Sequence, residues 1–294
     1  MHKITPHLWF DTQAKEAAAF YTRLFSNSRI VSTTTIHDTP SGSNDIVNIE
    51  LMGQPFQMIS AGPLFRFTPA VSFRVDCATK DAVKTLHDGL IDGGMALVPL
   101  GEYPFSPQFA WVQDRFGLSW QLVYTADGAP QEAITPVLMF VGAVCGKAEE
   151  AVRFYTSVFK DAHMGDILRY GSDEAPDVEG TVKQAAFTLA GQSFAAMDSA
   201  QPHEFTFNEA ISFIVSCHDQ GEIDYYWNQL SAVPESEQCG WLKDKYGVSW
   251  QIVPAAMDEM MKTDDPAQLT RVVQAFLPMK KFDLAALQRA WEGT

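Results

Sequence analysis

The sequence predicts an α+β protein that contains two tandem copies of one domain, with two β-α-β-β-β units in each copy, followed by a C-terminal helical tail. The first observation is a repeated phrase: "DRFGLSWQLVY" at 114–124 returns as "DKYGVSWQIVP" at 244–254. The second is that "FTPAVSFRVDC" at 67–77 returns as "FNEAISFIVSC" at 207–217. Repeats roughly 130 to 140 residues apart, in unchanged order, indicate a duplicated domain rather than a solenoid array.

The first unit combines a strand, an amphipathic helix and three further strands. The opening strand is "ITPHLWF" at 4–10, and the helix from Thr12 to Phe25 carries apolar residues at helical spacing. Gly53 provides a hairpin turn between the last two strands of the unit. The three strands that follow the helix are expected at 28–36, 45–52 and 54–60.

The second unit begins the same rhythm again. A strand at 70–77 precedes a helix at 79–94, which ends at Gly93 and Gly94. Because the second copy carries corresponding blocks, we expect four units in the whole chain. The closing strands of this second unit are expected at 107–114 and 117–124.

The repeat divides the chain into two domains, a linker and a tail. The linker is polar and contains turn residues, and we expect the halves to pack as a pseudo-dimer within one monomeric chain. In the tail, Asp265 and Asp283 are expected to cap helices whose apolar stripes dock on the parent fold or form a subunit contact. The expected segments are 1–125 (first domain), 126–133 (linker), 134–254 (second domain) and 255–294 (tail).

Composition and charge describe a soluble protein that avoids anionic surfaces. The 294 residues are 46% hydrophobic, which is enough to build a substantial core. The net charge of −15 argues against nucleic acid and against an anionic membrane surface as partners. The start of the chain lacks the apolar core of a signal peptide, and no apolar run is long enough to span a membrane. With four cysteines read as reduced thiols, we expect a cytoplasmic location.

Several of these phrases also resemble a known group of proteins. They are similar to the vicinal oxygen chelate superfamily (the glyoxalase, bleomycin-resistance and dioxygenase group) and, within it, to the PhnB-like family, which also carries the label 3-demethylubiquinone-9 3-methyltransferase. The resemblance implies the glyoxalase-like fold of paired β-α-β-β-β units. The first copy departs from it, with Phe109 and Ala110 where the second copy has Cys239 and Gly240. The matching phrases are "FNEAISFIV" (207–215), "CGWLKDKYGVSWQIVP" (239–254), "ITPHLWFDTQAKEAAAFY" (4–21) and the tail at 264–291.

The methyltransferase label finds no support in the sequence itself. Binding S-adenosylmethionine in the usual way needs a glycine-rich turn between a strand and a helix. The glycines here are expected in hairpins and at helix ends. We therefore predict no cofactor.

The resemblance also implies where a metal would be held. Metalloenzymes of the superfamily use two histidines on the first strands of paired units and a glutamate on the last strand. Thr, Ala and a neutral amide are poor donors for transition metals, so we predict no metal site. By strand register the three positions fall on Thr5, Ala70 and Gln121 in the first copy, and on Thr135, Ala210 and Gln251 in the second.

Two single residues leave more than one interpretation open. His7 shares a strand face with Thr5 and is read either as a partly exposed strand histidine or as an unusual ligand. Cys239 is read either as packing beside a glycine or as a reactive thiol whose pKa is lowered by Lys243 and Lys245.

The predicted function is the binding of a small molecule, aromatic or amphipathic, in a metal-free β-cup. The alternative is a glyoxalase-like enzyme, of the lyase, isomerase or dioxygenase type, with an unusual metal site. We expect the better-formed pocket near Gln251, because the second copy keeps more of the family's phrases. The sequence leaves open whether units are exchanged between the halves. The pocket candidates are Gln251, Gln121, Trp241, Trp250, Cys239, Phe207, Glu209, Phe140, Trp9 and His7.

Overall fold

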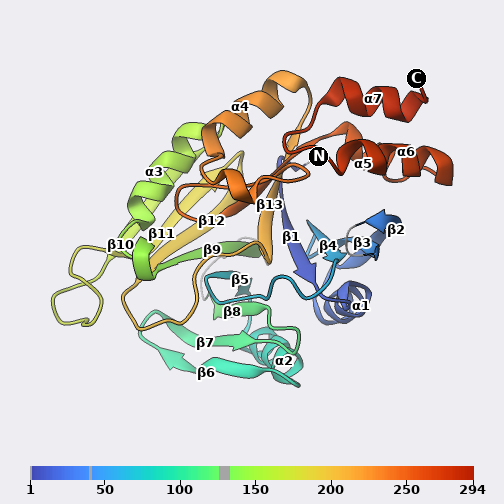
Figure 1. The fold of residues 1–294 in the computed structure, drawn as a ribbon. Coiled ribbons are helices and arrows are strands. Elements are labelled where there is room, and N and C mark those ends of the chain that lie inside the picture. The colour runs from blue at the N-terminus through green and yellow to red at the C-terminus, as the bar shows by residue number, and fades with distance from the viewer. Residues whose placement is uncertain (1, 40–41, 126–132) are drawn as a thin grey trace.

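The computed structural model describes residues 2–39, 42–125 and 133–294. The predicted α+β fold of tandem domains with a helical tail is confirmed (Figure 1). The expected linker, apart from residue 133, lies outside the described residues. The first unit consists of β1 (Ile4–Phe10), α1 (Ala14–Leu24), β2 (Arg29–Thr39), β3 (Gly42–Leu51) and β4 (Gln54–Ser60).

The next two units follow the same order of elements. The strand at Met95–Tyr103 (β6) was not predicted from the sequence, because its residues show neither clear alternation nor flanking phrases that recur in the second copy. The second unit consists of β5 (Val71–Cys77), α2 (Lys80–Ile91), β6 (Met95–Tyr103), β7 (Ser106–Gln113) and β8 (Ser119–Tyr124). The third consists of β9 (Ala133–Val141), α3 (Ala148–Val158), β10 (His163–Arg169), β11 (Val182–Leu189) and β12 (Gln192–Ser199).

The fourth unit is abbreviated and runs directly into the tail. A 3-10 turn at Pro234–Ser236 stands where the second unit has β6, and the following strand is only three residues long. Asp265 and Asp283 cap α6 and α7, as expected, by accepting backbone N–H groups. The elements are β13 (Ile211–Cys217), α4 (Gln220–Leu230), β14 (Trp241–Lys243), β15 (Ser249–Pro254), α5 (Ala256–Met260), α6 (Pro266–Phe276) and α7 (Leu284–Glu292).

The strands form two sheets, and each sheet takes strands from both halves of the chain. The seven-stranded sheet has the order β14-β15-β13-β1-β4-β3-β2, and the eight-stranded sheet has the order β10-β11-β12-β9-β5-β8-β7-β6. Units one and four therefore share one sheet, while units two and three share the other. The antiparallel junctions pair β1 with β13 and β9 with β5, with His7 opposite Ser212 and Val137 opposite Ser72.

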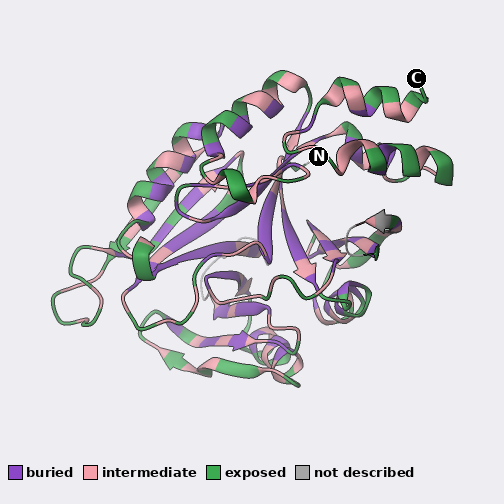
Figure 2. Cartoon of the chain, viewed as in Figure 1, coloured by how far each residue is buried: buried purple, intermediate pink, exposed green. Residues whose placement is uncertain are grey.

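Each sheet has one face packed on helices and one face turned away from them. α1 and α4 pack on the seven-stranded sheet, and α2 and α3 pack on the eight-stranded sheet. On β1 the alternation puts Ile4, Leu8 and Phe10 into the core, so Thr5, His7 and Trp9 lie on the opposite face. Figure 2 shows that the central strands are largely buried, whereas the edge strands β6 and β10 and the outer surfaces of the helices are exposed or half-buried. We call the two faces opposite the helices the first cup (seven strands) and the second cup (eight strands).

The Asp and Trp residues of the repeated Asp-Gly-Trp phrase form a buried hydrogen-bond network beneath the helices. Tyr155 and Trp250 donate to one oxygen of Asp244 at 2.8 and 2.9 Å, and two backbone N–H groups donate to the other. Tyr21 and Trp120 do the same for Asp114. Burial raises the pKa of both carboxyls, and the donors satisfy their oxygens. The Asp and Trp of the phrase therefore serve the core, while the glutamine beside the Trp faces a cup.

Candidate functional site

A cavity of about 1450 Å³ occupies the first cup. Its floor consists of cup-facing residues of β1, β4, β13 and β15, and β2 and β3 form one wall. The segment before β14 and the tail close the opposite side, where the backbone N–H groups of Cys239 and Gly240 donate to Met279 and Lys280, both at 2.7 Å. In Figure 1 the tail helices stand above β2, β3 and β4, and Thr34 on β2 donates to the carbonyl of Met261 at 3.2 Å, so the tail also reaches the wall formed by β2 and β3. Tail residues that line the cavity include Met257, Met261, Phe276, Leu277 and Phe282.

Neutral polar side chains cross the floor of the cavity. Gln251 donates to Ser212 at 2.9 Å, which fixes the amide on the sheet. On the other side of β1, Gln57 donates to Asn48 at 3.0 Å, and Asn48 donates to Ser32 at 3.0 Å. Sequence reasoning missed this second group, although the period-two alternation of "QPFQMIS" would have put Gln57 on the cup face.

His7 stands at the centre of this polar floor. Its side chain is 3% exposed, so the expectation of a partly exposed histidine is wrong. Burial lowers the pKa of His7 to about 3, and the imidazole is neutral at physiological pH. Its Nδ1 atom has no hydrogen-bond partner among the described residues. The floor of the cavity therefore contains a buried ring nitrogen that makes no hydrogen bond to the described residues.

Aromatic rings form the apolar part of the lining. The Trp241 ring packs edge-on against His7, with 5.2 Å between ring centroids, and lies 6.1 Å from the Trp9 ring. Trp9 also meets Phe65 at 5.1 Å, and its indole N–H donates to the carbonyl of Gly62 at 2.8 Å. The Trp9 ring is therefore held in place on both sides.

The structure brings most of the sequence-predicted pocket residues into this one cavity. The exchange of units matters here, because β1 carries His7 and Trp9 into the sheet that carries Gln251. The grouping of Thr5 with Gln121 in one copy is wrong, since β1 shares its sheet with β15 rather than β8. The predicted residues that line the cavity are His7, Trp9, Glu209, Cys239, Trp241 and Gln251.

Three predicted pocket aromatics belong to the core instead. Trp250 is fully buried on the helix side, where it packs against Phe159 and Tyr155. Phe140 and Phe207 pack on each other, with 5.1 Å between their rings. Alternation along a strand explains the error for Trp250: a residue next to cup-facing Gln251 must face the other way.

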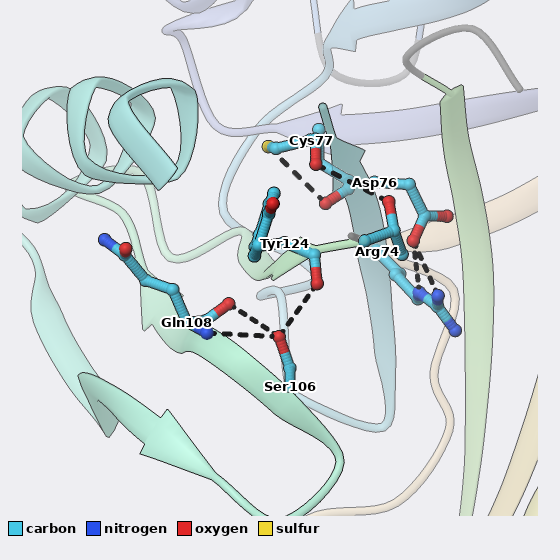
Figure 3. A network of polar contacts seen from close by, with 8 residues as sticks. Arg74, Asp76, Cys77, Ser106, Gln108 and Tyr124 are labelled. Carbon is cyan, nitrogen blue, oxygen red and sulfur yellow. Dashed lines mark hydrogen bonds and ion pairs between the residues drawn. The ribbon is translucent and has the colours of Figure 1, made fainter. Parts of the chain in front are cut away.

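Gln121 lies in the second cup, whose polar and charged side chains differ from those of the first cup. It donates to Ser72 at 2.9 Å, as Gln251 does to Ser212. On the same cup face, Arg74 forms an ion pair with Asp76 at 2.6 Å, where the first cup has Ile214 and Ser216 (Figure 3). Val137 stands where the first cup has His7, so the two cups share the glutamine but not the polar floor.

Cys239 is poorly suited to nucleophilic chemistry. Burial raises the pKa of its thiol, opposite to the lowering that the neighbouring lysines would cause. Lys243 is engaged with Glu209 at 2.7 Å and Lys245 lies 3.7 Å from Glu150. The thiol lies 3.4 Å from the carbonyl of Leu277, so Cys239 joins the tail to the cup.

The donors in the first cup do not fit a transition metal. His7 and Gln251 converge on the same floor, but their neighbours at the strand positions are Thr5, Ser212 and Ile214. One imidazole with an amide and hydroxyls is a weak donor set for such ions. Across the described residues, no three His, Cys, Asp or Glu side chains gather in a way that could hold a metal ion.

The turn between β9 and α3 was overlooked in the sequence. Gly142 begins a 3-10 turn there and Gly146 stands two residues before α3, both with positive φ, so a glycine-containing turn does join a strand to a helix. Its backbone donors are already taken, because Asp198 accepts the N–H groups of Gly146 at 2.7 Å and Ala148 at 3.1 Å. The chain's own carboxylate occupies the position that an anionic group of a cofactor would need, so the turn does not fit S-adenosylmethionine.

The charged groups on the lining are mostly acidic. One lysine, Lys262, stands among them and lies 3.1 Å from Asp258. Two of the carboxylates are also paired, Glu50 with Arg29 and Glu209 with Lys243, each at 2.7 Å. The lining carboxylates are those of Glu50, Glu209, Glu235 and Asp258.

Comparison with known proteins gives a family match in both halves. A family model described as 3-demethylubiquinone-9 3-methyltransferase matches residues 2–123 and again residues 132–253. The solved structure of a putative 3-demethylubiquinone-9 3-methyltransferase, PhnB protein, from Bacillus cereus is 39% identical. That alignment covers 42% of this chain and all of the Bacillus protein, with a TM-score of 0.40. No curated protein matches the sequence.

Two longer solved structures show likeness in fold alone. Glyoxalase I from Zea mays is 12% identical, with a TM-score of 0.53 over 87% of this chain and 95% of its own. A putative dioxygenase from Bacillus subtilis is also 12% identical, with a TM-score of 0.50 over 95% of this chain and 97% of its own. Among the described residues, no helix has the length and apolar character needed to cross a membrane.

Proposed function

We propose that this chain binds a small amphipathic ring compound in the first cup without a metal. The chain belongs to the PhnB-like family described as 3-demethylubiquinone-9 3-methyltransferase. One observation carries the proposal. A large cavity combines aromatic rings with neutral hydrogen-bonding groups, and His7, Trp241 and Gln251 meet in it although they come from opposite ends of the chain. Apolar walls with a few polar anchors are the ordinary design of a small-molecule site.

The charge of the lining narrows the class of ligand. Three of the four lining carboxylates are ion-paired, so the field that acts on a ligand comes mainly from the net charge of −15 on the whole chain. This field repels anions. The ligand is therefore an uncharged or cationic compound rather than a phosphate ester or a sulfonate. The methionines contributed by the tail add a deformable apolar surface that suits ligands of varied shape.

A fluorescence titration tests the proposal with two dyes of opposite character. Nile red is uncharged and polycyclic, and we expect it to bind with one site per chain, whereas the anionic dye 1-anilinonaphthalene-8-sulfonate binds much more weakly. Gln251→Leu removes an amide of the floor and is expected to weaken Nile red binding about fivefold to tenfold. Gln121→Leu, the matched change in the second cup, leaves the affinity unchanged. Absence of Nile red binding, or equal effects of the two substitutions, contradicts the proposal.

The alternative function is a glyoxalase-like enzyme. The convergence of His7 and Gln251 in one cup favours it, because one imidazole then lies on the same floor as Gln251, which occupies the position of the superfamily's glutamate. The side chains on the floor of the first cup are poor metal donors, and they argue against a bound metal ion. Protein purified without a histidine tag should contain far less than one transition-metal ion per chain, and added nickel, manganese, iron or zinc should leave the melting temperature unchanged. One bound ion per chain, lost in His7→Val, would support the enzyme.

A further inference from the structure

The two cups differ at a corresponding tryptophan and serine. In the second cup, the indole N–H of Trp111 donates to the hydroxyl of Ser119 at 2.6 Å. In the first cup, the hydroxyl oxygen of Ser249 is buried and has no partner among the described residues. Trp241, the counterpart of Trp111, packs against His7 instead. The tryptophan and the serine are therefore hydrogen-bonded to each other in the second cup but not in the first.

A second unpaired atom lies in the same row of the sheet. His7 stands opposite Ser212 on β13, and Ser212 stands beside Ser249 on β15. The Nδ1 atom of His7 and the hydroxyl oxygen of Ser249 are both buried without partners. Buried polar atoms in proteins are nearly always hydrogen-bonded, because an unpaired one keeps its desolvation penalty. His7 lines the cavity, so two such atoms in one row of the sheet that ends at the cavity indicate an arrangement that changes when the cavity is filled.

We propose that Trp241 is a gate with two positions and that His7 is the polar anchor which the gate uncovers. When a ligand enters, the indole leaves His7 and donates to Ser249, the bond that Trp111 already makes to Ser119. The imidazole then meets the polar edge of the ligand. The inference rests on the proposed binding function and adds how the ligand is recognised.

The position of Trp241 permits this movement. It lies on β14, a three-residue strand at the edge of the seven-stranded sheet. Its side chain is only partly buried and borders the cavity, so a change of rotamer displaces no core residue. Trp9 stays in place, because its indole is bonded to Gly62 and its ring packs on Phe65.

The anchor also defines the ligand more closely. A neutral imidazole offers one hydrogen-bond donor and one acceptor, and Gln251 adds an amide next to it. The flat faces of Trp9 and Trp241 select a planar ring. The geometry therefore points to an uncharged ring compound whose edge carries a carbonyl, a hydroxyl or a ring N–H.

The first arm of the test needs no ligand. For the second arm, the protein is labelled with 5-fluorotryptophan. The fluorine NMR signals of Trp241 and Trp111 are assigned by their loss in Trp241→Phe and Trp111→Phe. Ser119→Ala should lower the melting temperature by about 2–3 °C, because Trp111 loses its acceptor. Ser249→Ala should not lower it, since the Ser249 hydroxyl has no partner before binding. Equal losses in the two variants would overturn the gate.

The second arm uses Nile red, which carries a ring carbonyl. Saturation should shift the Trp241 signal and leave the Trp111 signal in place. Ser249→Ala and His7→Val should each raise the Kd about fivefold, whereas Ser119→Ala leaves it within twofold. If Ser249→Ala binds like the wild type while Gln251→Leu binds weakly, the gate is wrong and the proposed function stands. If Nile red fails to bind, the proposed function is wrong, and an unequal response of the two serine variants in the first arm still decides whether Ser249 is free.

Discussion

His7 is a histidine whose charge is suppressed by its position on the floor of the first cup. In an unfolded chain it would take up a proton near pH 6.5, whereas burial lowers its pKa in the folded protein to about 3. Between these values the unfolded chain binds one proton more than the folded protein does. Stability from this residue is therefore complete above pH 6.5 and is lost as the pH falls toward 3.

This difference predicts a pH-dependent gap between the wild type and His7→Val, which copies Val137 of the second cup. On going from pH 7 to pH 5, the free energy of unfolding of the wild type should fall by about 2 kcal/mol more than that of His7→Val. Urea unfolding at the two pH values measures both. Parallel losses in the two proteins would show that the folded protein protonates His7 as readily as the unfolded chain does.

Single residues also show what the sequence could and could not predict. The resemblance places the glutamines in the cups correctly, because the superfamily's glutamate position falls on Gln121 and Gln251. Trp250 and Phe140 were misplaced although alternation excludes them from the cup faces that Gln251 and Val137 occupy. The depth of burial of His7 was out of reach, since it depends on Trp241, which is more than two hundred residues away in the chain.

At the scale of elements, the tail is joined to the first cup through Gly240. A methyl group at this position would come within 2.5 Å of the Phe282 ring and 3.0 Å of the Ile252 carbonyl oxygen, and φ is +82°. Gly180 has a similar φ of +85°, but nothing lies within 4 Å of its missing Cβ. An alanine at either position incurs the cost of backbone strain, but only at position 240 does it also clash with the tail. Comparing the two substitutions therefore isolates the close contact between tail and cup.

We expect Gly240→Ala to lower the free energy of unfolding by about 3 kcal/mol and Gly180→Ala by about 1 kcal/mol. Gly240→Ala should also weaken Nile red binding, because Phe282 and the adjoining tail cover the cavity. Gly180→Ala should not. Urea unfolding and fluorescence titration check both effects, and a Gly240→Ala protein as stable as the control would exclude a tight junction between tail and cup.

At the scale of the whole molecule, the halves are joined by strand pairing rather than by the linker alone. β1 pairs with β13 and β5 pairs with β9, so both junctions connect the first half to the second. Local sequence patterns cannot distinguish this exchange from two self-contained halves, because each unit keeps the same elements in either case. Only contacts between residues far apart in the chain decide it.

Cutting the chain within residues 126–132 is therefore expected to leave the molecule assembled. With an inserted protease site, the two fragments should co-elute from a size-exclusion column at the volume of the uncut protein, which we expect to be a monomer. They should separate only in denaturant, because two sheets would have to be broken. Separate elution in buffer would contradict strand exchange between the halves, and light scattering at twice the chain mass would contradict the monomer.

The exchange of units also determines how a binding site is inherited. The first cup draws on the first and the fourth unit, and the tail that lines its cavity follows directly after β15. A recombination event at the linker would give the offspring protein half of each parental cup, with His7 from one parent and Gln251 from the other. If the first cup binds a ligand as proposed, selection for that ligand acts on both halves of the chain at once, whereas the ion pair of Arg74 with Asp76 belongs to the second cup alone.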